Sequence, residues 1–265
     1  MARIIAVTNQ KGGVGKTTTT VNLAASLAHF KKKVLLVDLD PQGNATMGSG
    51  IDKHELEQST CEAIMGDCRV SEAVKRAEDS GFDVLPSNSD LTAAEVGLMN
   101  ATLKEKRLKL ALESVASDYD FILIDCPPSL NMLTLNALVA SNSVLIPIQT
   151  EYYALEGLSA LLRTIEQVKD HMNAELHIEG ILRTMHDARN NLAYQVSSQL
   201  INHFGDQVFQ TIIPRNVRVA EAPSHGIPIL HYDKTSRGAV SYMALASEVM
   251  RKEKKHAASK AEQNG

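Results

Sequence analysis

The chain has 265 residues, of which 44% are hydrophobic and 22% are charged, and its net charge at pH 7 is −4. This length and composition suit one α/β domain with a well-buried core, and the small acidic excess argues against a wholly basic nucleic-acid-binding protein. No apolar run reaches the length of a membrane span and the first residues lack a signal peptide's layout, so we expect a cytoplasmic protein.

Short apolar runs alternate with amphipathic segments along the chain. Apolar runs of this kind are typical of buried parallel strands, which we expect at 4–7, 34–37, 82–85, 121–124, 144–148, 178–182 and 208–213. Helical spacing predicts helices at 16–30, 93–99, 104–116, 155–168, 192–204 and 239–255, whereas 49–77 shows only short helical stretches. The alternation predicts an α/β fold, a mostly parallel twisted sheet with helices on both faces, in one domain over 1–255. The polar segment 256–265 is expected to be a flexible tail.

The first predicted strand ends in a glycine-rich loop with the sequence VTNQKGGVGKTTTT at 7–20. Its glycines allow a tight turn whose backbone N–H groups point inward and form an anion nest. The helix that begins near Lys16 adds unpaired N–H groups and the positive end of its dipole at the same point. Lys16 is placed to reach the β- and γ-phosphates of a nucleotide, and the Thr17 hydroxyl to bind Mg²⁺.

The loop departs from the ordinary phosphate-loop pattern at one position. Gln10 stands where that pattern has a glycine, and Lys11 is an additional cation in front of the glycines. A second lysine close to Lys16 is unfavourable unless several phosphate charges are shared, so Lys11 is a candidate to reach the phosphates of a facing subunit in a two-fold dimer. A solvated loop lysine is the alternative.

Acidic residues follow two further strands of the predicted sheet. Asp38 and Asp40 come at the end of the second run, and Asp125 follows the apolar residues FILI. Ligands bind at the carboxyl ends of the strands in such sheets, where Asp125 would hold the hydration shell of Mg²⁺ and Asp40 would position an attacking water. From the residues alone, Asp125 as a helix cap and the other two as turn formers beside Pro41 stay open.

Three motifs resemble those of the deviant-Walker ATPases, namely KGGVGKTT at 11–18, VDLDPQGNAT at 37–46 and FILIDCPPSL at 121–130. The resemblance implies the P-loop NTPase fold with a deviant Walker A loop. Three more are similar to those of the ParA/Soj family of DNA-partition ATPases, within the ParA/MinD superfamily: TEYYALEGL at 150–158, TMHDARNNL at 184–192 and PRNVRVAEAPSHGIP at 214–228. The resemblance extends over residues 3–250.

The resemblance implies roles for individual residues. Lys11 would be the signature lysine that contacts the partner's nucleotide across an ATP sandwich, acting with Lys16 and Asp40 in hydrolysis, and Asp125 would be the Walker B acid. The implied ATP-binding residues are Lys11, Gly12, Gly13, Val14, Gly15, Lys16, Thr17, Thr18, Pro214 and Asn216. The implied Mg²⁺ residues are Thr17, Asp40 and Asp125.

The resemblance also implies non-specific binding of double-stranded DNA through Arg189 and Arg218. Basic residues are frequent in the last third of the chain, at Arg189, Arg215, Arg218, Lys234, Arg237 and the run RKEKK at 251–255. Arg183 departs from the family pattern, which has leucine there, and would be either a DNA contact or a surface charge. Because the sequence begins almost at the first strand, we expect no N-terminal helix-turn-helix domain and no operator binding.

The implied function is an ATPase for chromosome or plasmid segregation. An ATP-bound homodimer would associate with the nucleoid and be released by hydrolysis that a ParB/Spo0J-type partner stimulates. A MinD-like membrane ATPase is the alternative, but the residues after Met250 include no large apolar side chain that would bind lipid. An electron-transfer iron protein would need bridging thiolates, and only Cys126 lies near the predicted site. No motif indicates a metabolic phosphoryl-transfer substrate.

Overall fold

The structure, a computed structural model, describes residues 2–151 and 154–263, the segment 254–263 by its backbone alone. Within these residues one sheet of eight strands has the order β3-β4-β2-β5-β1-β6-β7-β8, and only β3 is antiparallel to its neighbour. The strands are β1 (Arg3–Val7), β2 (Val34–Asp38), β3 (Lys75–Ala77), β4 (Phe82–Leu85), β5 (Phe121–Asp125), β6 (Ser143–Gln149), β7 (His177–His186) and β8 (Val208–Pro214). The predicted P-loop α/β fold is confirmed, and β3 is the one strand that the sequence did not reveal.

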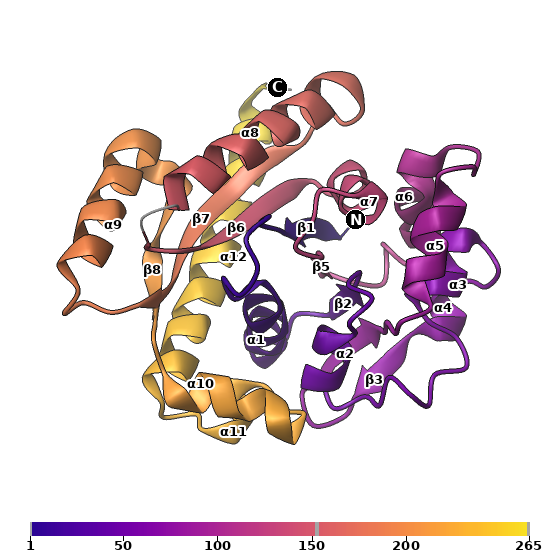
Figure 1. Cartoon of the computed structure of the whole chain (residues 1–265), viewed down its shortest axis with the longest axis horizontal. Helices are drawn as coiled ribbons and strands as arrows, with labels where there is room; N and C mark the ends of the chain where they lie inside the picture. The colour runs from indigo at the N-terminus through magenta and orange to yellow at the C-terminus, as the bar shows by residue number, and fades with distance from the viewer. Residues whose placement is uncertain (1, 152–153, 264–265) are drawn as a thin grey trace.

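Helices cover both faces of the sheet (Figure 1). They are α1 (Lys16–His29), α2 (Asn44–Gly48), α3 (Thr60–Met65), α4 (Val70–Ala73), α5 (Leu91–Leu98), α6 (Arg107–Glu113), α7 (Met132–Ala140), α8 (Ala154–His171), α9 (Asn191–Phe204), α10 (Val217–Glu221), α11 (Ile229–Tyr232) and α12 (Arg237–Gln263). The 3₁₀ turns are η1 (Lys104–Lys106), η2 (Gly205–Gln207) and η3 (Ala222–His225). No helix of the described chain combines the length and apolar character needed to cross a membrane.

The alternation of side chains along the strands divides the apolar core into two layers. Ile5 and Val7 of β1 pack with α1 and α12 on one face, where these two helices run against each other (Figure 1). Ala6 of the same strand packs with α7 and α8 on the opposite face. Because β2 and β5 are buried at every position, their continuous apolar runs are what a strand covered on both sides requires.

The last helix is longer than predicted. We expected it to end at 255, whereas α12 continues to Gln263. The additional residues, HAASKAEQ, contain neither glycine nor proline and several strong helix formers, so nothing in them stops the helix. We expected a flexible tail because this segment is polar. Polarity shows that a segment has no buried face, but it does not show that the segment is not helical.

A carboxylate from α12 binds the outer edge of β8, the last strand of the sheet. Glu248, which is buried, accepts hydrogen bonds from the amides of Gln210 and Thr211 at 2.8 and 3.0 Å and from the Thr211 hydroxyl at 2.8 Å. The pairing register between β7 and β8 shifts at this point. Glu248 therefore satisfies donors of β8 where its pairing with β7 is interrupted, and it attaches α12 to the sheet.

We expect Glu248→Ala to destabilise the chain by about 1–3 kcal/mol, because it removes three charge-assisted hydrogen bonds at once. The measurement is the urea midpoint of unfolding at constant m-value. Glu253→Ala, on the same helix, is the control and should change stability by less than about 0.5 kcal/mol. Equal midpoints for the two variants would contradict this role of Glu248.

Candidate functional site

The register of the central strands brings the predicted site residues to one edge of the sheet. Asp125, at the end of β5, pairs with Val7 of β1 on one side and with Asp38 of β2 on the other. The glycine loop that follows β1, the acidic loop that follows β2 and the Walker B candidate therefore meet at the carboxyl ends of three adjacent strands. This is the edge where open α/β sheets bind ligands.

The glycine loop has the conformation that an anion nest requires. Gly13 and Gly15 have φ values of 71° and 86°, a region that residues with a Cβ rarely adopt. Gly15 is the N-cap of α1, so no side chain accepts hydrogen bonds from the first turn of the helix. A Cβ on Gly12 or Gly13 would meet no other atom within 4 Å, which shows that the space above the loop is open. The loop amides and the end of α1 are thus available to bind phosphate.

The two lysines of the loop have different environments. Lys16 is buried, its Nζ lies 3.3 Å from the Lys11 carbonyl oxygen, and desolvation lowers its pKa against the attraction of Asp125 and Asp40. The Lys11 Nζ lies 2.7 Å from Glu151 Oε2, and about half of each side chain is exposed. Lys16 therefore lies near the buried Asp125 and Asp40, whereas Lys11 extends outward to the half-exposed Glu151.

The surroundings of Asp125 fit a Mg²⁺ ion. This carboxyl is fully buried, Oδ1 accepts a hydrogen bond from the Thr20 hydroxyl at 3.1 Å, and Oδ2 has no hydrogen bond of ordinary geometry among the described residues. Burial and the neighbouring Asp38 raise the pKa of Asp125 to about 8, although the hydroxyls of Thr17 and Thr20 favour the charged form. A divalent cation beside Oδ2 would replace the proton that this environment favours.

The described residues include no cluster of three or more His, Cys, Asp or Glu side chains suited to a metal. Mg²⁺ needs none, because it usually takes one or two protein carboxylates and completes its shell with water and substrate phosphates. The candidate ligands Thr17, Asp40 and Asp125 agree with that chemistry, and they remain a proposal.

Asp38 holds the acidic loop in shape. Its Oδ2 accepts hydrogen bonds from the amide and the hydroxyl of Thr46, both at 2.8 Å, and its Oδ1 accepts one from the Asp40 amide at 3.2 Å. Burial raises the pKa of Asp38 to about 6 against these hydrogen bonds. Gly43 turns the loop with φ 61°, and a Cβ there would lie 2.5 Å from the Ser87 carbonyl oxygen. The sequence left Asp38 open as a turn former, and the structure shows a buried carboxylate that joins both ends of the loop.

Asp40 is positioned by that loop. It is 8% exposed, its Oδ1 accepts the Gln42 amide at 3.0 Å, and its carbonyl oxygen accepts the Ser87 hydroxyl at 3.0 Å. Asp40 also acts electrostatically on Lys16 and on Asp125. The two carboxylates and the lysine predicted to act on the nucleotide are therefore neighbours in the folded chain.

Strand β7 also contacts the phosphate loop, which the sequence did not indicate. The Thr184 hydroxyl donates a 2.8 Å hydrogen bond to the Val14 carbonyl oxygen, and Thr184 is the nearest neighbour of Gly15. The next residue, Met185, has φ 48°, an uncommon conformation outside glycine. In the sequence, TMHDARNNL served only as a family motif, because nothing local in it points to the loop.

Arg183 is neither a DNA contact nor a surface charge, so both sequence-based alternatives are wrong. It is 5% exposed, donates from Nη1 to the Ser197 hydroxyl at 2.9 Å and from Nη2 to the Phe209 carbonyl oxygen at 2.7 Å, and burial lowers its pKa. It joins β7 to α9 and β8 from inside.

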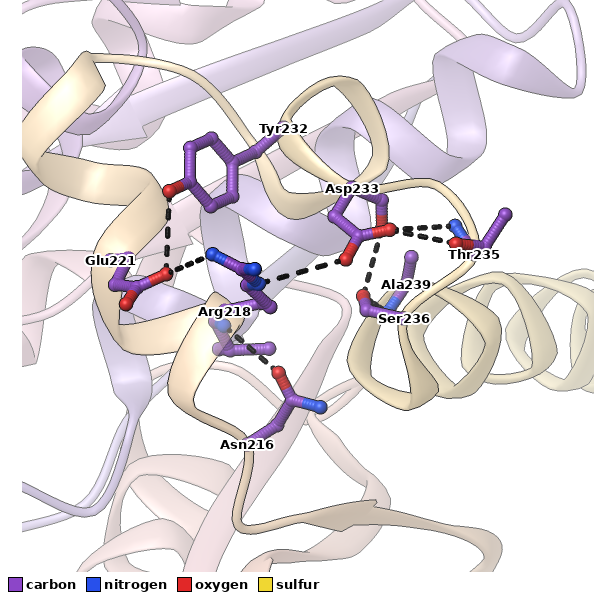
Figure 2. A network of polar contacts seen from close by, with 9 residues as sticks. Asn216, Arg218, Glu221, Tyr232, Asp233, Thr235, Ser236 and Ala239 are labelled. Atoms are coloured by element: carbon purple, nitrogen blue, oxygen red, sulfur yellow. Dashed lines mark hydrogen bonds and ion pairs between the residues drawn. The ribbon is translucent and has the colours of Figure 1, made fainter.

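The segment 214–228 begins at the end of β8, at the same edge of the sheet as the phosphate loop. Pro214, the last residue of β8, pairs with His186 at the end of β7. Asn216 is the N-cap of α10, and its Oδ1 accepts the Val219 amide at 3.2 Å (Figure 2). The structure therefore gives Asn216 a helix-capping function, and its predicted contact with adenine stays a prediction.

The predicted DNA-binding arginines are exposed, and both have carboxylate partners. Arg189 lies between β7 and α9, and its Nη2 is 2.8 Å from Asp187 Oδ2. Arg218 lies on α10, with Nη1 2.9 Å from Glu221 Oε2 (Figure 2). Lys252, from the basic run on α12, instead donates to the Glu179 carbonyl oxygen at 2.9 Å and lies 4.4 Å from the Phe209 ring centroid. Lys252 is therefore part of the packing and adds no free charge to a DNA surface.

Comparisons with known proteins assign the chain to a family. A family model described as AAA domain matches residues 2–178. The sporulation initiation inhibitor protein Soj of Bacillus subtilis is 56% identical over 94% of this chain and 98% of its own length. The chromosome partitioning protein ParA of Myxococcus xanthus is 52% identical over 96% of this chain and 89% of its own length. This chain belongs to the ParA/Soj family. The predicted resemblance is thereby confirmed.

Solved structures place the ParA/Soj chain among P-loop ATPase folds. A structure described as cobyrinic acid a,c-diamide synthase from Mycobacterium smegmatis with bound ADP and magnesium superimposes with a TM-score of 0.85, at 38% identity and 96% coverage of both chains. The cell division ATPase MinD of Pyrococcus furiosus has a TM-score of 0.78, at 26% identity, 95% coverage of this chain and 99% of its own. The fold is thus shared more widely than the function.

The raised pKa of Asp125 has a consequence for stability. In the unfolded chain this carboxyl ionises near its ordinary value of 3.8, whereas in the folded chain it keeps its proton to about pH 8. Its contribution to stability is therefore fully present below pH 4 and is lost as the pH rises toward 8. Without nucleotide or Mg²⁺, we expect Asp125→Asn to be more stable than the parent chain at pH 8 by on the order of 1–3 kcal/mol. Urea unfolding at pH 4, 6 and 8 tests this, and a difference that does not grow with pH would contradict it.

Proposed function

We propose that the chain is an ATPase that drives chromosome or plasmid segregation. It binds ATP with Mg²⁺, forms a homodimer in that state, binds double-stranded DNA non-specifically and is released when ATP is hydrolysed to ADP and phosphate. A ParB/Spo0J-type centromere-binding protein stimulates hydrolysis, and the protein is cytoplasmic and associated with the nucleoid. The observation that carries this proposal is Lys11 directly before the glycines of the phosphate loop, in a chain that is 56% identical to a protein named Soj.

The proposed mechanism relies on positioning and charge. Mg²⁺, when bound through Thr17, Asp40 and Asp125, supplies neutralisation of the β- and γ-phosphate charge. The amides of residues 12–18 and the Lys16 ammonium hold the phosphates, and the low-dielectric surroundings of Lys16 strengthen that attraction. Asp40, fixed by its own loop, orients the attacking water.

Lys11 is assigned to the nucleotide of the facing subunit. Its side chain extends from the loop to the half-exposed Glu151 rather than into the cradle of Lys16. An exposed ion pair of this kind is worth little, so Lys11 can exchange Glu151 for a more highly charged phosphate. Since the interface is two-fold, each ATP would be contacted by Lys16 of its own chain and by the Lys11 ammonium of the other.

A metabolic function is a second candidate, because the M. smegmatis structure is described as a diamide synthase. That structure is 38% identical to this chain, whereas the proteins named Soj and ParA reach 56% and 52% over nearly the whole length. The higher identity favours partition. ATP-dependent DNA binding separates the two candidates, since an amide-forming enzyme has no use for it.

We expect Lys11→Ala to retain ATP binding and to lose ATP-driven dimerisation, because the cradle of residues 12–18 stays intact while the contact across the interface is removed. Light scattering with ATP, ADP and no nucleotide measures the assembly, and fluorescent-nucleotide titration measures binding. Asp40→Ala is the matched control, since loss of the water-orienting acid should stabilise the ATP dimer. A Lys11→Ala chain that dimerises as the parent does would contradict the assignment of Lys11.

We expect the Arg189→Ala, Arg218→Ala double variant to bind random-sequence DNA more weakly than the parent when both are saturated with ATP. Each lost phosphate contact should reduce the slope of log affinity against log salt concentration by about 0.9. Affinity with ATP, with ADP and without nucleotide at two salt concentrations tests the proposal, with ATP binding as the control. Unchanged DNA retention at moderate salt would contradict the assignment of these arginines.

A further inference from the structure

Each arginine proposed to bind DNA already holds a carboxylate of its own chain. The Arg189 guanidinium forms a two-pronged contact with Asp187, in which Nε donates to Oδ1 at 2.9 Å and Nη2 to Oδ2 at 2.8 Å. The Arg189 amide donates to the same Oδ1 at 3.0 Å. This pairing lowers the pKa of Asp187, so the carboxylate is charged at neutral pH.

The second arginine lies between two carboxylates, one of which it contacts by a hydrogen bond (Figure 2). Arg218 Nη1 lies 2.9 Å from Glu221 Oε2, and Arg218 Nε lies 3.9 Å from Asp233 Oδ2. Glu221 Oε2 also accepts the Tyr232 hydroxyl at 3.3 Å, and Asp233 Oδ1 accepts the amide and hydroxyl of Thr235 at 3.2 and 2.9 Å. Both carboxylates are thus fixed by further contacts and do not depend on Arg218 for their position.

The fold also fixes Asp187. The Thr184 hydroxyl binds the Val14 carbonyl oxygen of the phosphate loop, and Met185 has a positive φ of 48°. The carbonyl oxygen of His186 accepts the Arg215 amide at 3.1 Å. Because Thr184 and His186 are attached to neighbouring elements, the backbone before Asp187 is held in place and this carboxylate needs little further ordering. The pair must therefore order mainly the 90% exposed Arg189 side chain, whereas an average surface ion pair orders two free side chains.

A carboxylate and a phosphate use the same donors of a guanidinium. DNA can therefore engage Arg189 or Arg218 through these donors only by displacing Asp187 or Glu221. We propose that these two carboxylates mask the DNA-binding arginines and keep the affinity of the nucleotide-free monomer for DNA low. This inference rests on the proposed function, and it makes stable DNA binding depend on adding the contacts of two chains.

The test measures DNA binding by the nucleotide-free chain. We expect Asp187→Asn and Glu221→Gln each to raise affinity for a random-sequence duplex by about threefold to fivefold at low salt, the range that an exposed, well-ordered ion pair supplies. Fluorescence anisotropy with a labelled duplex gives the affinity, and thermal unfolding shows whether each variant is folded. Unchanged affinity in both folded variants would overturn the inference.

Removing any carboxylate also reduces general repulsion of DNA, and a double-mutant cycle separates that effect. If Asp187 masks Arg189, the gain from Asp187→Asn disappears in the Arg189→Ala background, and the gain from Glu221→Gln disappears in the Arg218→Ala background. Asp206→Asn, an exposed carboxylate in η2 before the start of β8, is the charge-matched control and should leave affinity within about 1.5-fold. Gains of equal size in both backgrounds would overturn masking.

The two proposals fail in distinguishable ways. If the arginine variants bind DNA with ATP as well as the parent chain does, the assigned DNA surface is wrong. If the arginine variants bind more weakly but the carboxylate variants show no arginine-dependent gain, the DNA surface stands and the masking inference is wrong.

Discussion

The site depends on the burial of two carboxylates side by side at the carboxyl ends of two central strands. Asp38 and Asp125 are direct register partners at the ends of β2 and β5, and neither is exposed to solvent. Burial disfavours the charged form of both groups and raises both pKa values, and the neighbouring Asp38 raises the pKa of Asp125 further. The apolar residues before them fix both strands in the core, so the carboxyls cannot move to solvent. The fold thus keeps two carboxylates in a place where their charged forms are unfavourable, and a bound cation would offset that free-energy cost.

The two carboxylates respond to this constraint in different ways. Asp38 is satisfied by Thr46 and by the Asp40 amide, and so it becomes part of the scaffold that presents Asp40. Asp125 keeps one buried oxygen without an ordinary hydrogen bond among the described residues. One acid holds the loop, and the other remains available for a ligand. Their residue types and positions after an apolar run are identical, and only their neighbours distinguish them.

Strands β7 and β8 connect the nucleotide side to the proposed DNA side. Thr184 contacts the phosphate loop, and Asp187, three residues later, holds Arg189. Arg183 and Glu248 bind neighbouring backbone groups of β8 on the way to the segment that carries Arg218. The same short segment of chain therefore connects the phosphate loop to the arginines that we propose bind DNA.

The sequence by itself determined the fold class and the glycine-rich loop, because glycine spacing and continuous apolar runs are local signals, and it left the function of the three acids open between ligand binding and helix capping or turn formation. It did not determine that Arg183 is buried, that Asp38 joins the two ends of a loop, that α12 continues to Gln263, or that Arg189 and Arg218 already hold carboxylates. Only the tertiary structure decided these points. A charged side chain carries no local mark of its partner, and its environment is set by residues that become neighbours only when distant strands and helices pack together.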